Sequence, residues 1–90
     1  MNGGKGTALV TGAARGIGKG IVEQLAAEGY RVVAIDRLPE VEETAAASRA
    51  RGHDVVAELC DVRDRQAIAA LAERHAPLDV IVNNAAITAT

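Results

Sequence analysis

Short apolar runs rich in β-branched residues alternate along the chain with longer segments of helical periodicity. The apolar runs at 7–10, 30–35, 53–59 and 78–82 predict β-strands. The segments that follow the first three runs predict α-helices, the first starting near Arg15 or Gly16 and the second covering 40–51. This alternation indicates parallel βαβ units, and right-handed crossovers would arrange the strands in the order 3-2-1-4.

Glycine, aspartate and proline mark the expected ends of the three predicted helices. Gly29 and Gly52 should end the first and second helices, Asp64 should cap the third, and Pro77 should close it. Apolar positions that share one helical face are expected to be buried, namely Ile17, Ile21, Val22 and Leu25 in the first helix and Ile68, Leu71, Ala72 and His75 in the third. The nearly continuous fourth run predicts a central strand covered on both faces.

Composition limits the chain to one small domain and disfavours several classes of function. The 90 residues are 49% hydrophobic and show no repeat, linker or domain boundary. A net charge of −2 with interspersed acids and bases leaves no basic stripe, so we expect no nucleic-acid partner. No apolar run approaches the roughly 18 residues of a membrane span, and residues 1–6 lack an apolar signal segment, so we expect a cytoplasmic protein without membrane contact.

The cysteine and the histidines indicate no further chemistry. Cys60 is the only cysteine, which excludes an intrachain disulfide, and we interpret it as a small apolar residue at the end of a strand. His53 and His75 lie on different predicted elements with no cysteine or carboxylate cluster at ligand spacing, so no metal site is predicted. The acids Glu40, Glu42 and Glu43 are expected to form a solvated helix start.

A glycine-rich turn, Thr11-Gly12-Ala13-Ala14-Arg15-Gly16-Ile17-Gly18, stands between the first strand and the first helix. Gly12 permits a tight turn, Gly16 lets a pyrophosphate approach the backbone, and Gly18 lets the helix pack closely on the sheet. The helix N-terminus would then direct unpaired N–H groups at the anion. A turn without a ligand is the alternative. The candidate cofactor-binding residues here are Gly12, Ala14, Arg15, Gly16, Ile17 and Gly18.

Asp36 ends the second predicted strand, where a dinucleotide fold places an acid that binds the adenosine ribose. Its carboxylate can accept hydrogen bonds from the ribose hydroxyls and would repel the 2′-phosphate of NADP. Arg15 and Arg37 favour the opposite preference, because an arginine near this ribose can hold a 2′-phosphate. The balance favours NAD over NADP, and a plain turn acid before Pro39 is the alternative for Asp36.

Together these motifs resemble the N-terminal part of the short-chain dehydrogenase/reductase family over essentially all ninety residues. The spacing Thr-Gly-x-x-x-Gly-x-Gly of residues 11–18 resembles the shorter oxidoreductase branch, whereas the extended branch of epimerases and dehydratases has Gly-x-x-Gly-x-x-Gly. Asp61-Val62 resembles the pair that the family places against the adenine. Asn83-Asn84-Ala85-Ala86 resembles the family's Asn-Asn-Ala-Gly, with Ala86 in place of the usual glycine.

The resemblance implies a role for each of these residues. Asp61 would accept a hydrogen bond from the adenine amino group, and the Val62 backbone would add a second contact. Asn83 would brace the sheet, and Asn84 with Ala85 would line the adenosine ribose. From the residues alone, two alternative interpretations stay open. Asp61 could be an acid in the loop that leads into a helix, and Asn83-Asn84 could form a turn at the end of a strand.

The resemblance also implies an α/β fold with a partial Rossmann-type parallel sheet, in which 1–90 form the N-terminal part of a single dinucleotide-binding domain. The complete protein would transfer a hydride between nicotinamide and a small-molecule carbonyl or alcohol substrate, and we expect it to be a homo-oligomer. The family's reaction uses a Tyr-x-x-x-Lys pair with a serine and an asparagine. Tyr30, the one tyrosine, is followed four residues later by Ala34, so this chain should contain no catalytic residue and be inactive alone.

The competing interpretation is a non-catalytic half-Rossmann nucleotide-binding module. In isolation, the fourth strand would expose an unpaired backbone edge and favour association. Residues 85–90 have no helix to pair with and suggest a chain cut short. We therefore expect the missing sequence to belong to the same polypeptide.

Overall fold

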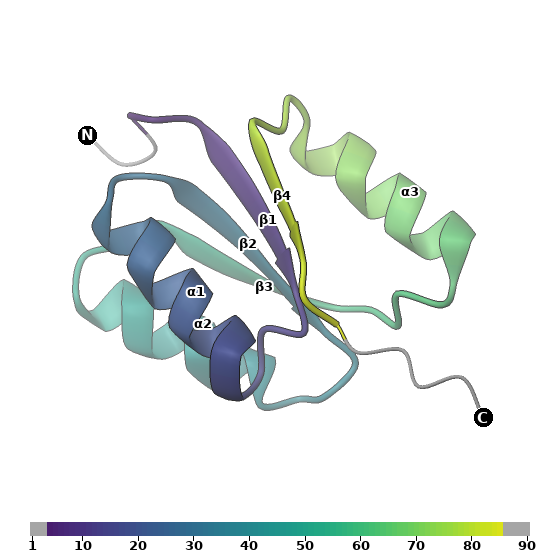
Figure 1. Ribbon diagram of the computed structural model, residues 1–90, viewed down its shortest axis with the longest axis horizontal. Coiled ribbons are helices and arrows are strands. Elements are labelled where there is room, and N and C mark those ends of the chain that lie inside the picture. Colours follow the sequence, from purple (N-terminus) through teal and green to yellow (C-terminus); the bar gives the residue numbers. More distant parts are fainter. Residues whose placement is uncertain (1–3, 86–90) are drawn as a thin grey trace.

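A computed structural model, which describes residues 4–85, shows one parallel sheet covered by helices on both faces (Figure 1). The strands are β1 (Thr7–Thr11), β2 (Arg31–Asp36), β3 (Val55–Leu59) and β4 (Val80–Asn83). The helices are α1 (Gly16–Ala27), α2 (Val41–Ala50) and α3 (Arg65–His75). All neighbouring strands pair in parallel in the order β3-β2-β1-β4, which confirms the predicted topology.

Each face of the sheet packs against different helices, because successive side chains of a strand point to opposite faces. The face covered by α1 and α2 holds the larger core cluster, which includes Val10 of β1, Val32 of β2 and Val55 of β3. The opposite face, covered by α3, holds a smaller cluster of Leu9, Val33, Ile35 and Leu71. The sheet is therefore the middle layer of three (Figure 1).

Strand bounds differ from the predicted ones by one or two residues, because pairing partners set them. Arg31 is the first residue of β2 to pair, opposite Thr7, so Tyr30 lies just outside the strand. Tyr30 packs half-buried against the larger core, with the Lys5 ammonium 6.0 Å from its ring centre. β3 begins at Val55, which pairs with Val32.

The predicted helix ends are confirmed. Gly29 follows α1 with a φ of 105°, and Gly52 follows α2 with a φ of 88°. These positive φ values favour glycine, which has no Cβ. At the start of α3, the Asp64 carboxylate accepts a hydrogen bond from the Ala67 amide at 3.1 Å.

The predicted burial of Ile17 is wrong, because its side chain is 76% exposed. The buried residues of α1 are Gly18, Val22 and Ala26, which recur at i, i+4 and i+8 along one face. Ile21 and Leu25 lie one and two turns after Ile17 on the same row and are half-buried against the core, so this row is covered only from the second turn of the helix. The predicted apolar face was therefore drawn too far toward the helix N-terminus.

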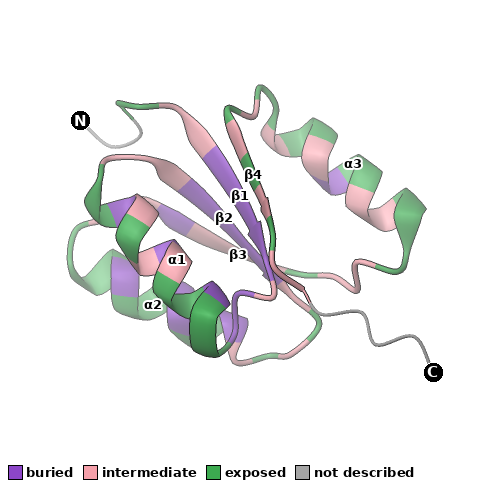
Figure 2. Ribbon diagram, in the orientation of Figure 1, coloured by how far each residue is buried: buried purple, intermediate pink, exposed green. Residues whose placement is uncertain are grey.

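The predicted burial of β4 on both faces is also wrong. Val80 and Val82 are half-buried, whereas Ile81 is 65% exposed (Figure 2). Ile81 pairs with Leu9, which is buried beside α3, but α3 does not extend far enough to cover Ile81. Within residues 4–85, β4 has β1 as its only neighbour, and an edge strand has one open side.

A polar contact joins the C-terminal end of α3 to the sheet. The Glu58 carboxylate on β3 forms an ion pair with Arg74, whose Nη2 lies 3.1 Å from Oε1, and its Oε2 lies 2.6 Å from His75 Nε2. The contact with His75, followed by that with Arg74, holds the pKa of Glu58 below its ordinary value. His75 therefore faces the sheet, as its position on the α3 face predicts.

Gly18→Ala should destabilise the fold by about 1–3 kcal/mol, the usual cost of overpacking. A Cβ on Gly18 would lie 1.9 Å from the Gly12 carbonyl oxygen. Gly20→Ala is the matched control in the same helix, since its added Cβ meets nothing within 4 Å. We expect this control to raise stability by up to about 1 kcal/mol. Urea denaturation compares the two variants, and equal stabilities would contradict the close packing of α1 on β1.

Candidate functional site

The carboxyl ends of four parallel strands meet at one edge of the sheet, where ligands bind in open α/β folds (Figure 1). The structure brings all the candidate segments to this edge, because each directly follows a strand. The turn 12–18 follows β1, Asp36 and Arg37 stand at the end of β2, 61–62 follow β3, and 84–85 follow β4.

The glycine-rich turn is tied to the end of β2 by two backbone amides. Ala13 N donates to the Ile35 carbonyl at 3.0 Å, and Ala14 N donates to Asp36 Oδ2 at 3.0 Å. Gly12 and Gly16 have φ values of 67° and 55°, which a side chain would disfavour. These constraints set the direction in which α1 leaves the turn.

The first turn of α1 presents backbone donors at the sheet edge. The amides of Gly16, Ile17 and Gly18 donate to no acceptor within residues 4–85, and the first helical donor is Lys19 N, to the Arg15 carbonyl at 3.2 Å. A Cβ built on Gly16 meets nothing within 4 Å, so this backbone is open. Free first-turn amides and the positive end of the helix dipole suit an anion.

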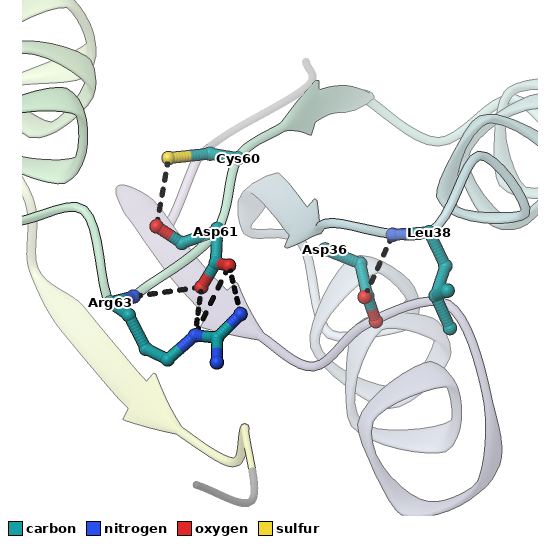
Figure 3. Close-up of polar contacts among 5 residues, drawn as sticks. All are labelled: Asp36, Leu38, Cys60, Asp61 and Arg63. Carbon is teal, nitrogen blue, oxygen red and sulfur yellow. Dashed lines mark hydrogen bonds and ion pairs between the residues drawn. The ribbon is translucent and has the colours of Figure 1, made fainter.

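Asp36 has a structural role in addition to its predicted one. Its Oδ2 accepts from the Ala14 amide, and its Oδ1 accepts from the Leu38 amide at 3.1 Å (Figure 3). Asp36 therefore acts as a turn acid, the alternative role that the sequence left open. Each carboxylate oxygen accepts only one of these hydrogen bonds and keeps a free lone pair, so Asp36 can also accept from a ligand.

Asp61 forms an ion pair with Arg63 that the sequence analysis missed. The Arg63 guanidinium contacts both oxygens of Asp61, with Nε–Oδ1 at 3.1 Å and Nη2–Oδ2 at 2.7 Å, and the Arg63 amide donates to Oδ1 at 2.9 Å (Figure 3). These hydrogen bonds lower the pKa of Asp61 to about 2. An arginine two residues after a turn acid was the available signal.

Cys60 precedes this pair, and its Sγ lies 3.6 Å from the Asp61 carbonyl oxygen (Figure 3). Its burial, together with the nearby carboxylates, raises the pKa of the thiol. A raised pKa keeps the thiol protonated at neutral pH, which agrees with the interpretation of Cys60 as an apolar residue.

Thr11 is the second residue that the sequence analysis missed, although it begins the glycine motif. Its buried hydroxyl accepts from the amides of Asn84 at 3.0 Å and Ala85 at 3.1 Å, and donates to Asn83 Oδ1 at 3.1 Å. Asn84 Nδ2 also donates to the Gly12 carbonyl at 3.3 Å. Thr11 therefore fixes the segment after β4 against the glycine turn.

Arg15 forms an ion pair with Glu40, which the sequence analysis placed on a solvated helix start. Arg15 Nε donates to Glu40 Oε2 at 3.1 Å. This contact raises the pKa of Arg15 and lowers that of Glu40. Arg37 is exposed and makes no ion pair with another residue of the described segment 4–85.

Some expectations concern features that lie elsewhere or are absent from the described segment. Ala86 and the rest of 86–90 lie outside the described residues, as do 1–3. Within 4–85, no group of three or more His, Cys, Asp or Glu side chains could hold a metal ion. None of the three helices in that range has the length and apolar character needed to cross a membrane.

Comparison with known proteins places these motifs in a family. The sequence model of the family described as short chain dehydrogenase matches residues 6–90. Oxidoreductase UcpA of Escherichia coli strain K12 is 40% identical over 85 residues, which cover 90% of this chain and 32% of that protein. L-2,3-butanediol dehydrogenase of Corynebacterium glutamicum is 43% identical over 88 residues, which cover 89% of this chain and 34% of that protein. The chain thus spans about a third of these relatives.

Solved structures with the same fold include complexes with either dinucleotide. A metagenomic short-chain oxidoreductase in complex with NADP is 37% identical, with a TM-score of 0.83, over 90% of this chain and 39% of that one. A short chain dehydrogenase from Mycobacterium paratuberculosis bound to NAD is 31% identical, with a TM-score of 0.82, over 92% of this chain and 37% of that one.

Arg63→Gln should raise the pKa of Asp61 from about 2 toward the ordinary 3.8, because the guanidinium no longer stabilises the carboxylate. A carboxyl group with a lowered pKa stabilises the folded state at pH values above its ordinary pKa of 3.8. This stability is lost as the pH falls from 3.8 to about 2. The variant should lose less stability across that range. Carboxyl-carbon NMR titration measures the pKa directly. Arg65→Gln, which removes an exposed arginine from α3, is the control and should leave Asp61 unchanged.

Proposed function

The chain belongs to the short chain dehydrogenase family, and we propose that it supplies the cofactor-binding half of an NAD-dependent oxidoreductase. One observation carries the proposal: free first-turn amides of α1 and the Asp36 carboxylate meet at the carboxyl edge of a parallel sheet. Hydrogen-bond donors for an anion lie beside a carboxylate that can accept from hydroxyl groups, and this arrangement matches the pyrophosphate and the ribose of a dinucleotide.

The glycine turn would hold the pyrophosphate. The amides of Gly16, Ile17 and Gly18 are the donors, and Gly12 with Ala14 shapes the approach to them. The open space in front of Gly16 leaves the backbone accessible to a phosphate. The exposed side chain of Ile17 stands beside these donors, where it can contact the bound cofactor.

The segments after β2, β3 and β4 would bind the adenosine half. Asp36 accepts from the ribose hydroxyls through its remaining lone pairs, and Asn84 with Ala85 lines the same ribose. Val62 contributes its backbone to the adenine. Asp61 would accept from the adenine amino group, but the Arg63 guanidinium contacts both of its oxygens, so adenine binding competes with an exposed arginine.

Asp36 favours NAD over NADP. Its carboxylate would face the 2′-phosphate of NADP, which carries close to two negative charges at neutral pH. The solved relatives include a complex with each dinucleotide, so family membership leaves this preference to the individual residues. Arg37 is a counteracting positive charge, but it follows Asp36 directly and cannot replace the ribose acceptor.

The nicotinamide of the cofactor would supply the hydride that is exchanged with a carbonyl or alcohol carbon of a small-molecule substrate. The residues of this chain bind and orient the cofactor, and we assign none of them to catalysis. The proton-transferring residues would lie in further sequence of a longer polypeptide, which we propose to be a cytoplasmic homo-oligomer. The 90 residues alone should be inactive.

A non-catalytic nucleotide-binding module is the second candidate, favoured by the open edge of β4 and the exposed Ile81. Such a module could associate through this edge. The intact mass of the natural protein decides between the two. A mature species of 9.3 kDa supports the module, and a species about three times larger supports the oxidoreductase.

Asp36→Ala should weaken NAD binding about tenfold or more, because hydrogen bonds to a charged group contribute about 1.5–3 kcal/mol. It should weaken NADP binding less, since the repulsion of the 2′-phosphate disappears with the carboxylate. Calorimetric titration of the natural-length protein measures both dissociation constants. Asp36→Asn removes the charge at nearly the same shape and keeps one of the two oxygens that accept from the turn amides. Urea denaturation of both variants then separates loss of charge from loss of structure. Tighter binding of NADP than of NAD by the unmodified protein would overturn the assignment of Asp36.

A further inference from the structure

We propose that Glu40 is a specificity-determining residue that favours NAD by keeping the Arg15 guanidinium from a 2′-phosphate. The inference rests on the proposed function and deepens it. Arg15 is the N-cap residue of α1, and Glu40 is the N-cap residue of α2. Both therefore lie at the carboxyl edge of the sheet, although 25 positions separate them in the sequence.

The contact itself directs the guanidinium toward α2. Arg15 Nε and Nη2 both donate to Glu40 Oε2, and the Nε–Oε2 distance is 3.1 Å. The Arg15 backbone belongs to the glycine turn, so its side chain starts beside the pyrophosphate donors. Glu40 thus takes up two donors of the guanidinium, the group that best recognises a phosphate.

Two carboxylates, those of Glu40 and Asp36, act on the charge of Arg15. Glu40 has the larger effect on the pKa of Arg15, and Asp36 adds to it, both raising the pKa. A 2′-phosphate entering near Asp36 would have to displace Glu40 from Arg15 and remain close to both acids. NAD lacks this phosphate and meets no such cost. The ion pair thus discriminates against NADP without touching NAD.

The expected size of the effect follows from the exposure of the pair. The Arg15 and Glu40 side chains are 69% and 37% exposed, and solvent weakens an exposed ion pair. Releasing Arg15 should therefore tighten NADP binding about two- to fivefold. Glu40 adjusts a preference for which Asp36 supplies the larger part.

The experiment compares dissociation constants of NAD and NADP for the natural-length protein and for Glu40→Gln, measured by calorimetric titration. The ratio Kd(NADP)/Kd(NAD) should fall about two- to fivefold in Glu40→Gln. Glu42→Gln is the matched control, because it removes the same charge from the exposed first turn of α2 and has no bond to Arg15. It should leave the ratio unchanged, because solvent and salt screen an exposed charge that holds no arginine.

A second pair of variants tests whether Glu40 acts through Arg15. In an Arg15→Gln background, Glu40→Gln should no longer improve NADP binding. A gain that persists there would show direct repulsion by Glu40 and overturn the proposal, as would an equal gain in Glu42→Gln. An unchanged ratio in Glu40→Gln would also overturn it. If the unmodified protein binds neither dinucleotide, the proposed function itself fails.

Discussion

The close approach of Gly18 to the Gly12 carbonyl determines how α1 sits on the end of β1, and the candidate site depends on it. Any side chain on Gly18 would meet this carbonyl oxygen. The same oxygen accepts a hydrogen bond from Asn84, so one backbone group joins the glycine turn, the helix and the segment after β4. Because the helix starts this close to the sheet, its free first-turn amides open onto the carboxyl edge.

Polar groups with two roles stabilise the same edge. The Thr11 hydroxyl satisfies two backbone amides after β4, and Asp36 satisfies one amide of the glycine turn and one of its own loop. These contacts pair amide groups that would otherwise lie unpaired near the core. Asp36, which we propose to bind the ribose, is therefore also a structural residue. Its two oxygens stabilise the turn, and its charge would contribute to the choice of cofactor.

Ion pairs at the surface adjust this site rather than build it. Arg15 pairs with Glu40 and Arg63 pairs with Asp61, so two of the positive charges near the sheet edge are already partly neutralised. Exposed pairs of this kind exchange easily with a competing charge, because solvent weakens each of them. Selectivity between two similar anionic cofactors can therefore depend on residues that do not contact the cofactor.

The sequence by itself determined the element order, the strand order and the positions of the glycine turn and Asp36, because periodicity, caps and strand ends are local signals. Only the tertiary structure decided that Ile17 and Ile81 are exposed and that Arg15 contacts Glu40. Burial depends on how far a neighbouring element reaches, and an ion pair between two loops depends on where their backbones meet. The sequence pattern of a single segment contains neither kind of information, because both depend on how separate segments are placed in space.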